Sequence, residues 1–110
     1  MTVAKLSETL QYQPFTLPAP DNPVTGGYVG DLLSWVMGRA KTGDAWVTIM
    51  SNANVAAVAL MADAACVILS ENVQPDEALL SRAKQQGINL LGSEKSSFTI
   101  AKEIADYLGS

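Results

Sequence analysis

The chain has 110 residues, of which 48% are hydrophobic and 16% are charged, with a formal net charge of −4, no histidine and one cysteine. One domain over residues 1–110 is expected at this length, with enough apolar residues for a single sizeable core. The absence of histidine and the lone Cys66 exclude the commonest general base, the commonest metal ligand, a disulfide framework and a zinc cluster within one chain.

The N-terminal part of the chain combines short elements with a proline-rich loop. Val3, Leu6 and Leu10 recur at helical spacing and predict a short amphipathic helix. The segment QYQPFTL (11–17) contains Pro14, which favours an edge strand. Three prolines in PAPDNP (18–23) predict a loop, and VTGGYVG (24–30) is predicted to form a short strand or an extended turn.

The remainder of the chain alternates helices and strands. A helix is predicted over residues 32–40, with Asp31 as its N-cap and Gly43 as its terminal glycine. Three apolar runs predict buried strands, namely AWVTIM (45–50), CVILS (66–70) and INLLG (88–92).

Helices are predicted between and after these strands. One covers residues 55–65 and is capped from SNAN (51–54), a second runs from Pro75 to Gly87, and Ser96 or Ser97 caps the last. This order predicts a three-layer α/β fold. Its mostly parallel sheet has about four or five strands, and helices cover both faces.

Several segments together resemble a known family of small domains. They are VTGGYVGDLLSWVM (24–37), GDAWVTI (43–49), NVAAVALM (54–61), PDEALLSRAKQQGINLL (75–91) and SSF (96–98). They are similar to the DRTGG domain, and most similar to small stand-alone clostridial-type versions related to the HPr kinase N-terminal domain. Asp21, Thr25, Gly26 and Gly27 match the naming motif in kind, but Asn22 stands where arginine is expected and two residues intervene before Thr25.

The resemblance implies an α/β fold like the HPr kinase N-terminal domain, a regulatory or association role, and no established catalysis. Such domains occur alone, in phosphotransacetylases and in regulatory pyrophosphatases that carry CBS domains. The family often has a histidine before the third helix, where Asn52 stands here, so a role for an imidazole is not implied. The chain contains no G-x-x-x-x-G-K-[ST] motif, so the phosphoryl transfer of the HPr kinases is not implied either.

A ligand site is predicted at the carboxyl ends of the strands, where open α/β sheets bind ligands. The loops there are polar and each opens a helix, whose free N–H groups favour anions. The candidate ligand-binding residues are Thr25, Gly26, Gly27, Asp31, Asn52, Asn54, Lys95, Ser96 and Ser97. The alternative is that each residue has only a structural role and binds no ligand. Asp31, Asn54 and Ser96 then serve only as N-caps, and the glycines only permit a positive φ. No catalytic or metal-binding residue is assigned.

The segment NVAAVALMADAA (54–65) predicts a helix that is apolar on all sides, since Asp63 is its only charged residue. Such a helix must be buried all round, so either a neighbouring helix or a second chain covers it. We favour a homodimer, the commonest oligomer. The candidate interface residues are Trp35, Val58, Met61, Ala62 and Ala65.

The leading hypothesis is a non-catalytic regulatory module that forms a homodimer and senses a small anionic ligand, such as an adenine nucleotide. The alternative is a dimeric structural adaptor that binds a partner enzyme and no small ligand. A phosphoryl-transfer protein ranks last, because the chain lacks a histidine, a P-loop and a carboxylate pair.

Other partner classes are excluded by the distribution of charge and apolar residues. The seven Lys and Arg residues are scattered and form no basic stripe, so no nucleic-acid partner is expected. No apolar run approaches the ~18 residues of a membrane span, and the first residues lack the apolar core of a signal peptide. We therefore expect a cytoplasmic protein with no membrane partner and no cofactor.

Overall fold

The apolar runs of the sequence form the central strands of a sheet in the computed structural model, which describes residues 1–109. The five strands are β1 (Gln13–Thr16), β2 (Gly26–Val29), β3 (Asp44–Thr48), β4 (Cys66–Leu69) and β5 (Leu90–Gly92). They lie in the order β1-β5-β4-β3-β2; β2 to β5 are parallel, and β1 is antiparallel to β5. The predicted mostly parallel α/β sheet is confirmed.

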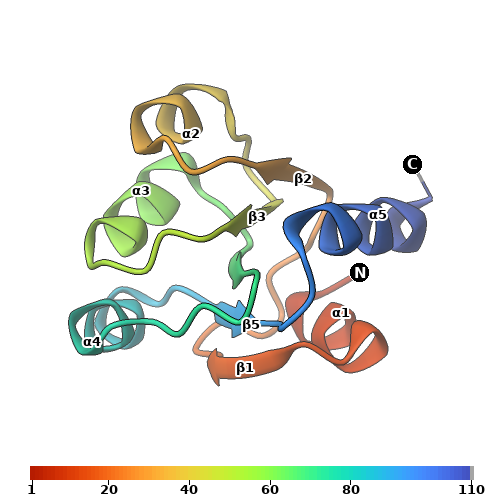
Figure 1. Cartoon of the computed structure of the whole chain (residues 1–110), viewed down its shortest axis with the longest axis horizontal. Coiled ribbons are helices and arrows are strands. Elements are labelled where there is room, and N and C mark those ends of the chain that lie inside the picture. Colours follow the sequence, from red (N-terminus) through yellow and green to blue (C-terminus); the bar gives the residue numbers. More distant parts are fainter. Residues whose placement is uncertain (110) are drawn as a thin grey trace.

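Helices cover both faces of this sheet (Figure 1). They are α1 (Val3–Leu10), α2 (Leu33–Arg39), α3 (Asn54–Ala62), α4 (Glu77–Gln86) and α5 (Ser97–Leu108). α1 and α5 pack on one face, and α2, α3 and α4 pack on the other. Successive side chains of a strand point to opposite faces. Ala45 and Val47 of β3 therefore join the α1–α5 core, while Trp46 joins the α2–α3–α4 core.

The caps of the last two helices follow from local sequence. Asp76 accepts a hydrogen bond from the N–H of Leu79 at 2.8 Å and caps α4, which ends at Gly87 with φ 74°. Ser96 accepts from the N–H of Thr99 at 3.1 Å and caps α5. The predicted helix closed by Gly87 and the Ser96 cap are confirmed, but the helix begins at Glu77, so Pro75 precedes the N-cap and does not lie in the first turn.

The predicted N-cap roles of Asp31 and Asn54 are wrong. The N-cap position of α2 is Leu32, whose side chain makes no capping bond. The Asp31 carboxylate instead accepts from Thr48 Oγ1 at 2.8 Å and from the N–H of Ile49 at 2.9 Å, because the chain brings it over the end of β3. Asn54 is the first residue of α3, and its N–H donates to the Asn52 side chain at 2.9 Å.

Gly43 does not end α2 as predicted. That helix ends at Arg39, and its C-cap residue Ala40 has an extended backbone. Gly43 has φ 86° and lies directly before β3. Only glycine adopts this conformation without steric cost, so the residue serves the entry to the strand and not the helix end.

The apolar helix α3 is buried within a single chain. α2 and α4 flank it on either side, and the sheet lies beneath it (Figure 1). Val58, Ala62 and Ala65 are buried as a result. The interface roles predicted for these three residues are therefore corrected, because neighbouring elements of the same chain already cover them. Of the five candidates, Trp35 and Met61 are exposed, at 52% and 68%.

Candidate functional site

The Gly26–Gly27 pair lies inside strand β2 and not at a helix N-terminus. Neither glycine has a positive φ, so the turn interpretation is wrong. β2 is parallel to β3, and its first residue lies opposite Asp44, the first residue of β3. Thr25, Gly26 and Gly27 thus lie at the amino ends of the strands. The prediction that they join the carboxyl-end loops is wrong, because the strand begins at these residues and does not end there.

The loops after β4 and β5 leave the sheet toward opposite faces. α4 follows β4 onto the face that carries α2 and α3, whereas α5 follows β5 onto the face that carries α1 (Figure 1). Neighbouring parallel strands whose connections diverge in this way form the crevice in which open α/β sheets bind ligands. The candidate site is therefore the β4/β5 crevice, between the loops at residues 70–76 and 93–96.

The two loops of the β4/β5 crevice are hydrogen-bonded to each other. Ser70 Oγ lies 2.6 Å from Ser97 Oγ. The N–H of Ser97 donates to Glu71 Oε2 at 3.2 Å, and the N–H of Glu71 donates to the carbonyl of Lys95 at 2.8 Å. The Glu71 carboxylate thus occupies the position at the N-terminus of α5 that favours negative charge. An incoming anion must displace it.

Glu71 and Asn72 both adopt left-handed backbone conformations, with φ 59° and 61°. Asn enters this region more readily than most residues, but for Glu it costs about 1–2 kcal/mol. Strained non-glycine residues of this kind cluster at ligand clamps and switch regions. Sequence reasoning missed Ser70 and Glu71 as site residues, since nothing in their spacing relates them to Ser97.

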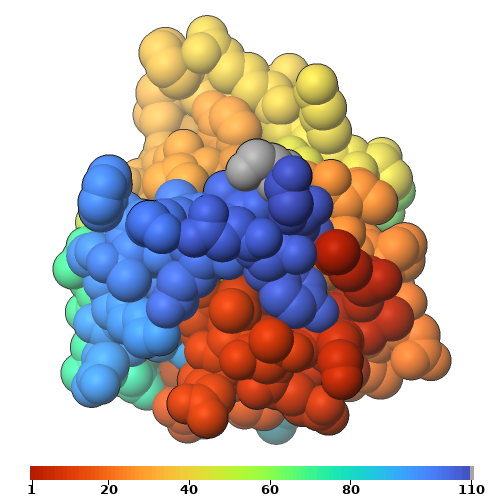
Figure 2. Space-filling model, turned by 90° about the vertical axis from the view of Figure 1, so that its right-hand side faces the viewer, coloured from red at the N-terminus to blue at the C-terminus, as the bar shows by residue number. Residues whose placement is uncertain are grey.

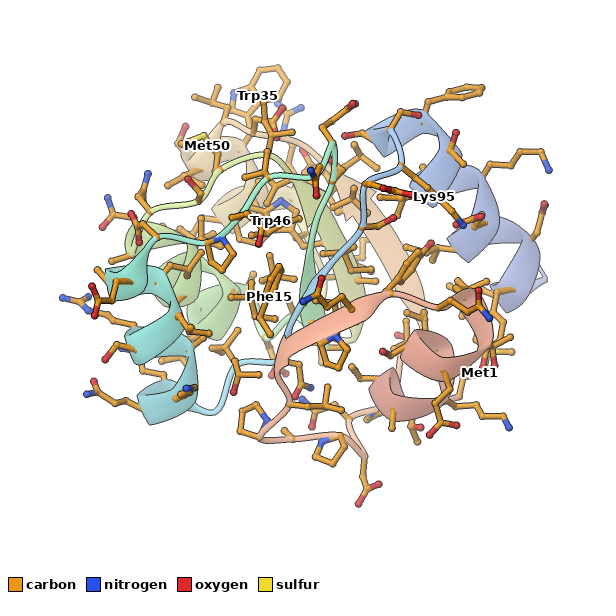
Figure 3. The ribbon with its side chains drawn as sticks, turned by 60° about the horizontal axis from the view of Figure 1, so that its bottom comes forward. Met1, Phe15, Trp35, Trp46, Met50 and Lys95 are labelled. Carbon is orange, nitrogen blue, oxygen red and sulfur yellow. The ribbon has the colours of Figure 1, made fainter. Side chains whose placement is uncertain are left out.

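Lys95, the predicted cation of the site, has its charge paired. Its Nζ lies 2.6 Å from Glu103 Oε2, and Tyr12 Oη donates to Glu103 Oε1 at 2.9 Å. Partial burial raises the pKa of Glu103, but hydrogen bonds from Lys95 and Tyr12, together with nearby positive charge, outweigh it and leave the pKa lowered. Figure 3 shows Lys95 beside α5, the helix that carries Glu103. Lys95 therefore does not offer a free charge to a ligand.

A polar hollow of about 320 Å³ opens beside Lys95. Its lining residues are Gln11, Gln13, Phe15, Asn72, Gln74, Gly92, Ser93, Glu94 and Lys95. Amide and hydroxyl groups predominate, and the ring of Phe15 lies so close to Gly92 that a Cβ there would collide with it. The volume is at the low end of the ~300–1,000 Å³ of small-molecule pockets.

The remaining predicted residues lie at a second corner of the carboxyl edge. Three strand spacings separate the end of β2 from the end of β5, so Asp31 lies on the order of 14 Å from Ser93. The nine candidates thus divide into three groups. Lys95, Ser96 and Ser97 lie at the β4/β5 crevice. Asp31, Asn52 and Asn54 lie beyond the carboxyl ends of β2 and β3, whereas Thr25, Gly26 and Gly27 lie at the amino ends of the strands.

The lone thiol takes no part in the site. Cys66 is fully buried in β4, and burial raises its pKa to about 12. A protonated thiol is a poor nucleophile and a poor metal ligand.

Within residues 1–109, no three His, Cys, Asp or Glu side chains gather as a metal site. No helix in this part of the chain has the length and apolar character to span a bilayer.

Comparison with known proteins gives one family and one solved structure. The DRTGG domain family model matches residues 30–107, a range that begins after Thr25–Gly27. No curated protein matches the chain. The CBS and DRTGG domains of the regulatory region of the Clostridium perfringens pyrophosphatase, complexed with the activator diadenosine tetraphosphate, have a similar fold, with a TM-score of 0.71 and 17% identity. The match covers 96% of this chain and 52% of that chain, so this chain spans about half of its length.

Proposed function

This chain belongs to the DRTGG domain family, and on that premise we propose that it is a non-catalytic regulatory module. It acts as a homodimer and senses a small anionic ligand, such as an adenine nucleotide. The similar structure is a regulatory region whose CBS and DRTGG domains together are complexed with the activator diadenosine tetraphosphate, which supports both the role and the ligand class.

The single observation that carries the ligand proposal is the β4/β5 crevice with its adjoining polar hollow. The hollow offers amide groups for the edge of a base, and the partly buried Phe15 is among its lining residues. Its volume of about 320 Å³ suits one nucleobase. The phosphates then extend to the N–H groups at the start of α5, where Glu71 now accepts from Ser97.

Ligand binding would act by exchanging these contacts. In the unliganded arrangement, Glu71 ties the β4–α4 loop to α5. A phosphate at the same N–H group releases Glu71 and lets the strained residues 71 and 72 relax. The ligand shifts the population of the two arrangements only by its difference in affinity for them. Because α5 packs on β2, a change at its N-terminus is transmitted to the edge of the sheet.

A thermal shift assay tests the ligand proposal directly. The chain is melted with AMP, ADP, ATP and diadenosine tetraphosphate, each with and without Mg²⁺. A ligand at one hundred times its dissociation constant stabilises by about 2.7 kcal/mol. For a domain of this size the expected shift is on the order of 10 °C.

A matched pair of variants locates the effect. Gln74→Glu places a negative charge in the lining of the hollow, so the shift is expected to fall. Gln85→Glu adds the same charge on the exposed side of α4 and leaves the shift unchanged. No shift with any nucleotide would contradict the ligand proposal, and an equal shift in both variants would move the ligand away from the hollow.

The exposed apolar surface favours a second candidate function, a dimeric structural adaptor for a partner enzyme. Of nine large hydrophobic side chains that are exposed, seven lie on or next to β2, α2, β3 and α3: Val29, Leu32, Trp35, Met37, Ile49, Leu60 and Met61. Figure 3 shows Trp35 at the periphery, while Trp46 lies inside the molecule. Association surfaces are rich in aromatic residues and Met and poor in charge at their centres. An adaptor would dimerise and give no nucleotide shift.

A further inference from the structure

We propose that two copies of this chain associate through the edge strand β2, which pairs antiparallel with β2 of the second copy about a two-fold axis at Tyr28. The proposal rests on the homodimer of the proposed function and names the surface that forms it. The two sheets then join into one continuous sheet, with the two α5 helices side by side on one face and the two α2 helices on the other.

Among residues 1–109, the backbone of β2 pairs with β3 on one side and with no strand on the other. The N–H of Gly30 donates to the carbonyl of Val47 in β3 at 3.1 Å. Backbone groups alternate in direction along an extended strand, so Tyr28 also faces β3, and the N–H and C=O groups of Gly27 and Val29 point outward. Such an edge is a template for a further strand. In the proposed register, Gly27 and Val29 of opposite copies exchange both hydrogen bonds.

The side chains of β2 are complementary to themselves in this register. Gly27 and Val29 lie opposite Ala45 and Val47, on the α5 side of the sheet. Val29 is 49% exposed, and an apolar groove of about 280 Å³ lies between β2 and α5. With the axis at Tyr28, Val29 of each copy lies opposite Gly27 of the other. The valine then enters the space that the missing glycine side chain leaves open.

The wall of this groove allows the second copy to approach closely. On the α5 side it is formed by Ala101, Ile104, Ala105 and Leu108. Figure 2 shows α5, in blue, across the front of the molecule, with the orange segment that includes β2 and the start of α2 above and behind it. The two small alanines leave room for the α5 helix of the second copy.

The distribution of charge favours a second copy of this chain as the partner that binds at the β2 edge. Between residues 23 and 38, Asp31 is the only charged side chain, and its Oδ1 already accepts two hydrogen bonds. Two chains of net charge −4 repel each other wherever their charged surfaces meet. The segment from residue 23 to residue 38 contributes almost no such repulsion, and the exposed charges of Lys102 and Asp106 on α5 are paired with each other. A strongly charged partner finds no complement along this segment, whereas the same apolar segment of a second copy does.

The molecule is large enough on this side for a stable interface, and only this edge of the sheet is open. The principal extents of 33 × 26 × 25 Å set an upper limit of roughly 600–900 Å² on the area that one side can bury, against the ~800 Å² per partner of a standard interface. The opposite edge of the sheet is closed to pairing, because β1 contains Pro14 and a register shift between Pro14 and Thr16. A second copy therefore extends the sheet at β2.

Light scattering after size-exclusion chromatography tests the placement on the full chain. The wild type is expected at twice the monomer mass of 11.6 kDa. Val29→Lys places a charge at the centre of the contact, and Gly27→Val fills the space that the partner's valine enters. Each is expected to weaken the dimer at least tenfold. A Cβ at Gly27 meets its nearest atoms at 3.5 and 3.8 Å, so the folded chain accommodates one there. Met61→Lys, at a 68% exposed position on α3, is the control and stays dimeric.

A disulfide trap tests the register independently. Directly opposed, non-hydrogen-bonded residues of an antiparallel pair have Cα atoms about 4.5 Å apart, within the range for a disulfide. Tyr28→Cys is therefore expected to give a covalent dimer with diamide, which takes up the two electrons and two protons that the thiols release. Thr9→Cys on α1 is the control and stays monomeric on a non-reducing gel. Buried Cys66 does not compete.

The outcomes separate this proposal from the proposed function. A dimer that survives Val29→Lys and Gly27→Val and gives no covalent product with Tyr28→Cys overturns the β2 placement and leaves the homodimer intact. A wild type that is monomeric at every concentration overturns the homodimer and the placement together. The nucleotide shift remains a separate measurement of the ligand proposal.

Discussion

β1 and β2 are the two edge strands of the same sheet, but only β1 carries features that stop a further strand from pairing. It contains Pro14, which cannot donate to a ladder, and its register with β5 shifts between Pro14 and Thr16. β2, with the sequence GGYV, has no proline and no charge, and its register with β3 is regular. One end of the sheet is closed to extension, and the other is open.

The two edges also differ in how they are attached to the rest of the molecule. At the end of β2, the buried indole of Trp46 donates to the carbonyl of Gly30 at 2.9 Å. Beyond β1, the Asn89 side chain bonds both the N–H and the carbonyl of Ala19. An apolar side chain with one hydrogen bond, Trp46, contacts the chain at the open edge, while one polar side chain, Asn89, holds it at the closed edge. The two edges are therefore expected to respond to different substitutions, the β2 edge to changes at Trp46 and the β1 edge to changes at Asn89.

Replacing Trp46 with Ala is expected to have the largest effect. Trp46 is 0% exposed and packs in the core between the sheet and α2, α3 and α4. Removing a buried aromatic side chain costs about 3–5 kcal/mol, a large part of the ~5–15 kcal/mol that stabilises a typical domain. Urea unfolding followed by circular dichroism measures the loss. Trp46→Phe keeps part of the packing but loses the donor to Gly30 and leaves a smaller cavity, so its loss is expected to lie below that of the alanine variant.

This prediction also bears on the open edge. If β2 is held mainly by Trp46, the alanine variant should weaken the dimer along with the fold. A loss below about 1 kcal/mol for Trp46→Ala would contradict that attachment. Protection of the β2 amides from hydrogen exchange should fall in the variant before protection of the β1 amides does.

Asn89→Ala is expected to have the second largest effect and to act at the closed edge. Asn89 is 1% exposed. It makes hydrogen bonds of 2.9 and 2.7 Å with Ala19 and of 3.0 Å with the carbonyl of Ala65. At about 1 kcal/mol for each bond, the expected loss is about 3 kcal/mol. Gln85→Ala on the exposed side of α4 is the control, expected to change stability by less than about 0.5 kcal/mol. Equal losses in the two variants would show that Asn89 does not hold the edge.

The strands and the last two helices could be predicted because local patterns determine them. The runs around Trp46 and Cys66 are continuous in apolar character, as strands buried on both faces require. Asp76 and Ser96 cap helices through residues three positions further on. In each case the sequence neighbours contain the physical cause.

The candidate site could be predicted only in part, because its contacts join residues far apart in the chain. Glu71 meets Ser97 across 26 residues, and Tyr12 meets Glu103 across 91. No spacing in the sequence relates these pairs. Lys95 lies at the carboxyl end of β5 and lines the hollow, but its ion pair with Glu103 depends on α5 folding back against the loop and has no sequence signal.

The interface prediction fails at three of its five residues, Val58, Ala62 and Ala65, for a similar reason. The apolar character of α3 was correctly identified, but the sequence does not show that α2 and α4 flank that helix and bury Val58 and Ala62. Conversely, Val29 gave no local signal, because its exposure depends on β2 being the last strand of the sheet. The position of an edge is a property of the whole sheet.

Glu103→Gln is expected to have the smallest effect on stability of the three substitutions. The difference in stability between wild type and variant is expected to depend on pH. The lowered pKa of Glu103 means that the folded chain binds this proton less readily than the unfolded chain. The stability it contributes is therefore present above the unfolded pKa of about 4.3 and is lost as the pH falls through the folded value. The side chain is partly exposed, so solvent screening keeps the contribution small, and high salt reduces it further. Urea midpoints of wild type and variant should differ near neutral pH and converge in acid. A difference that persists unchanged at low pH would show that the Glu103 side chain holds Tyr12 and Lys95 by shape and not by charge.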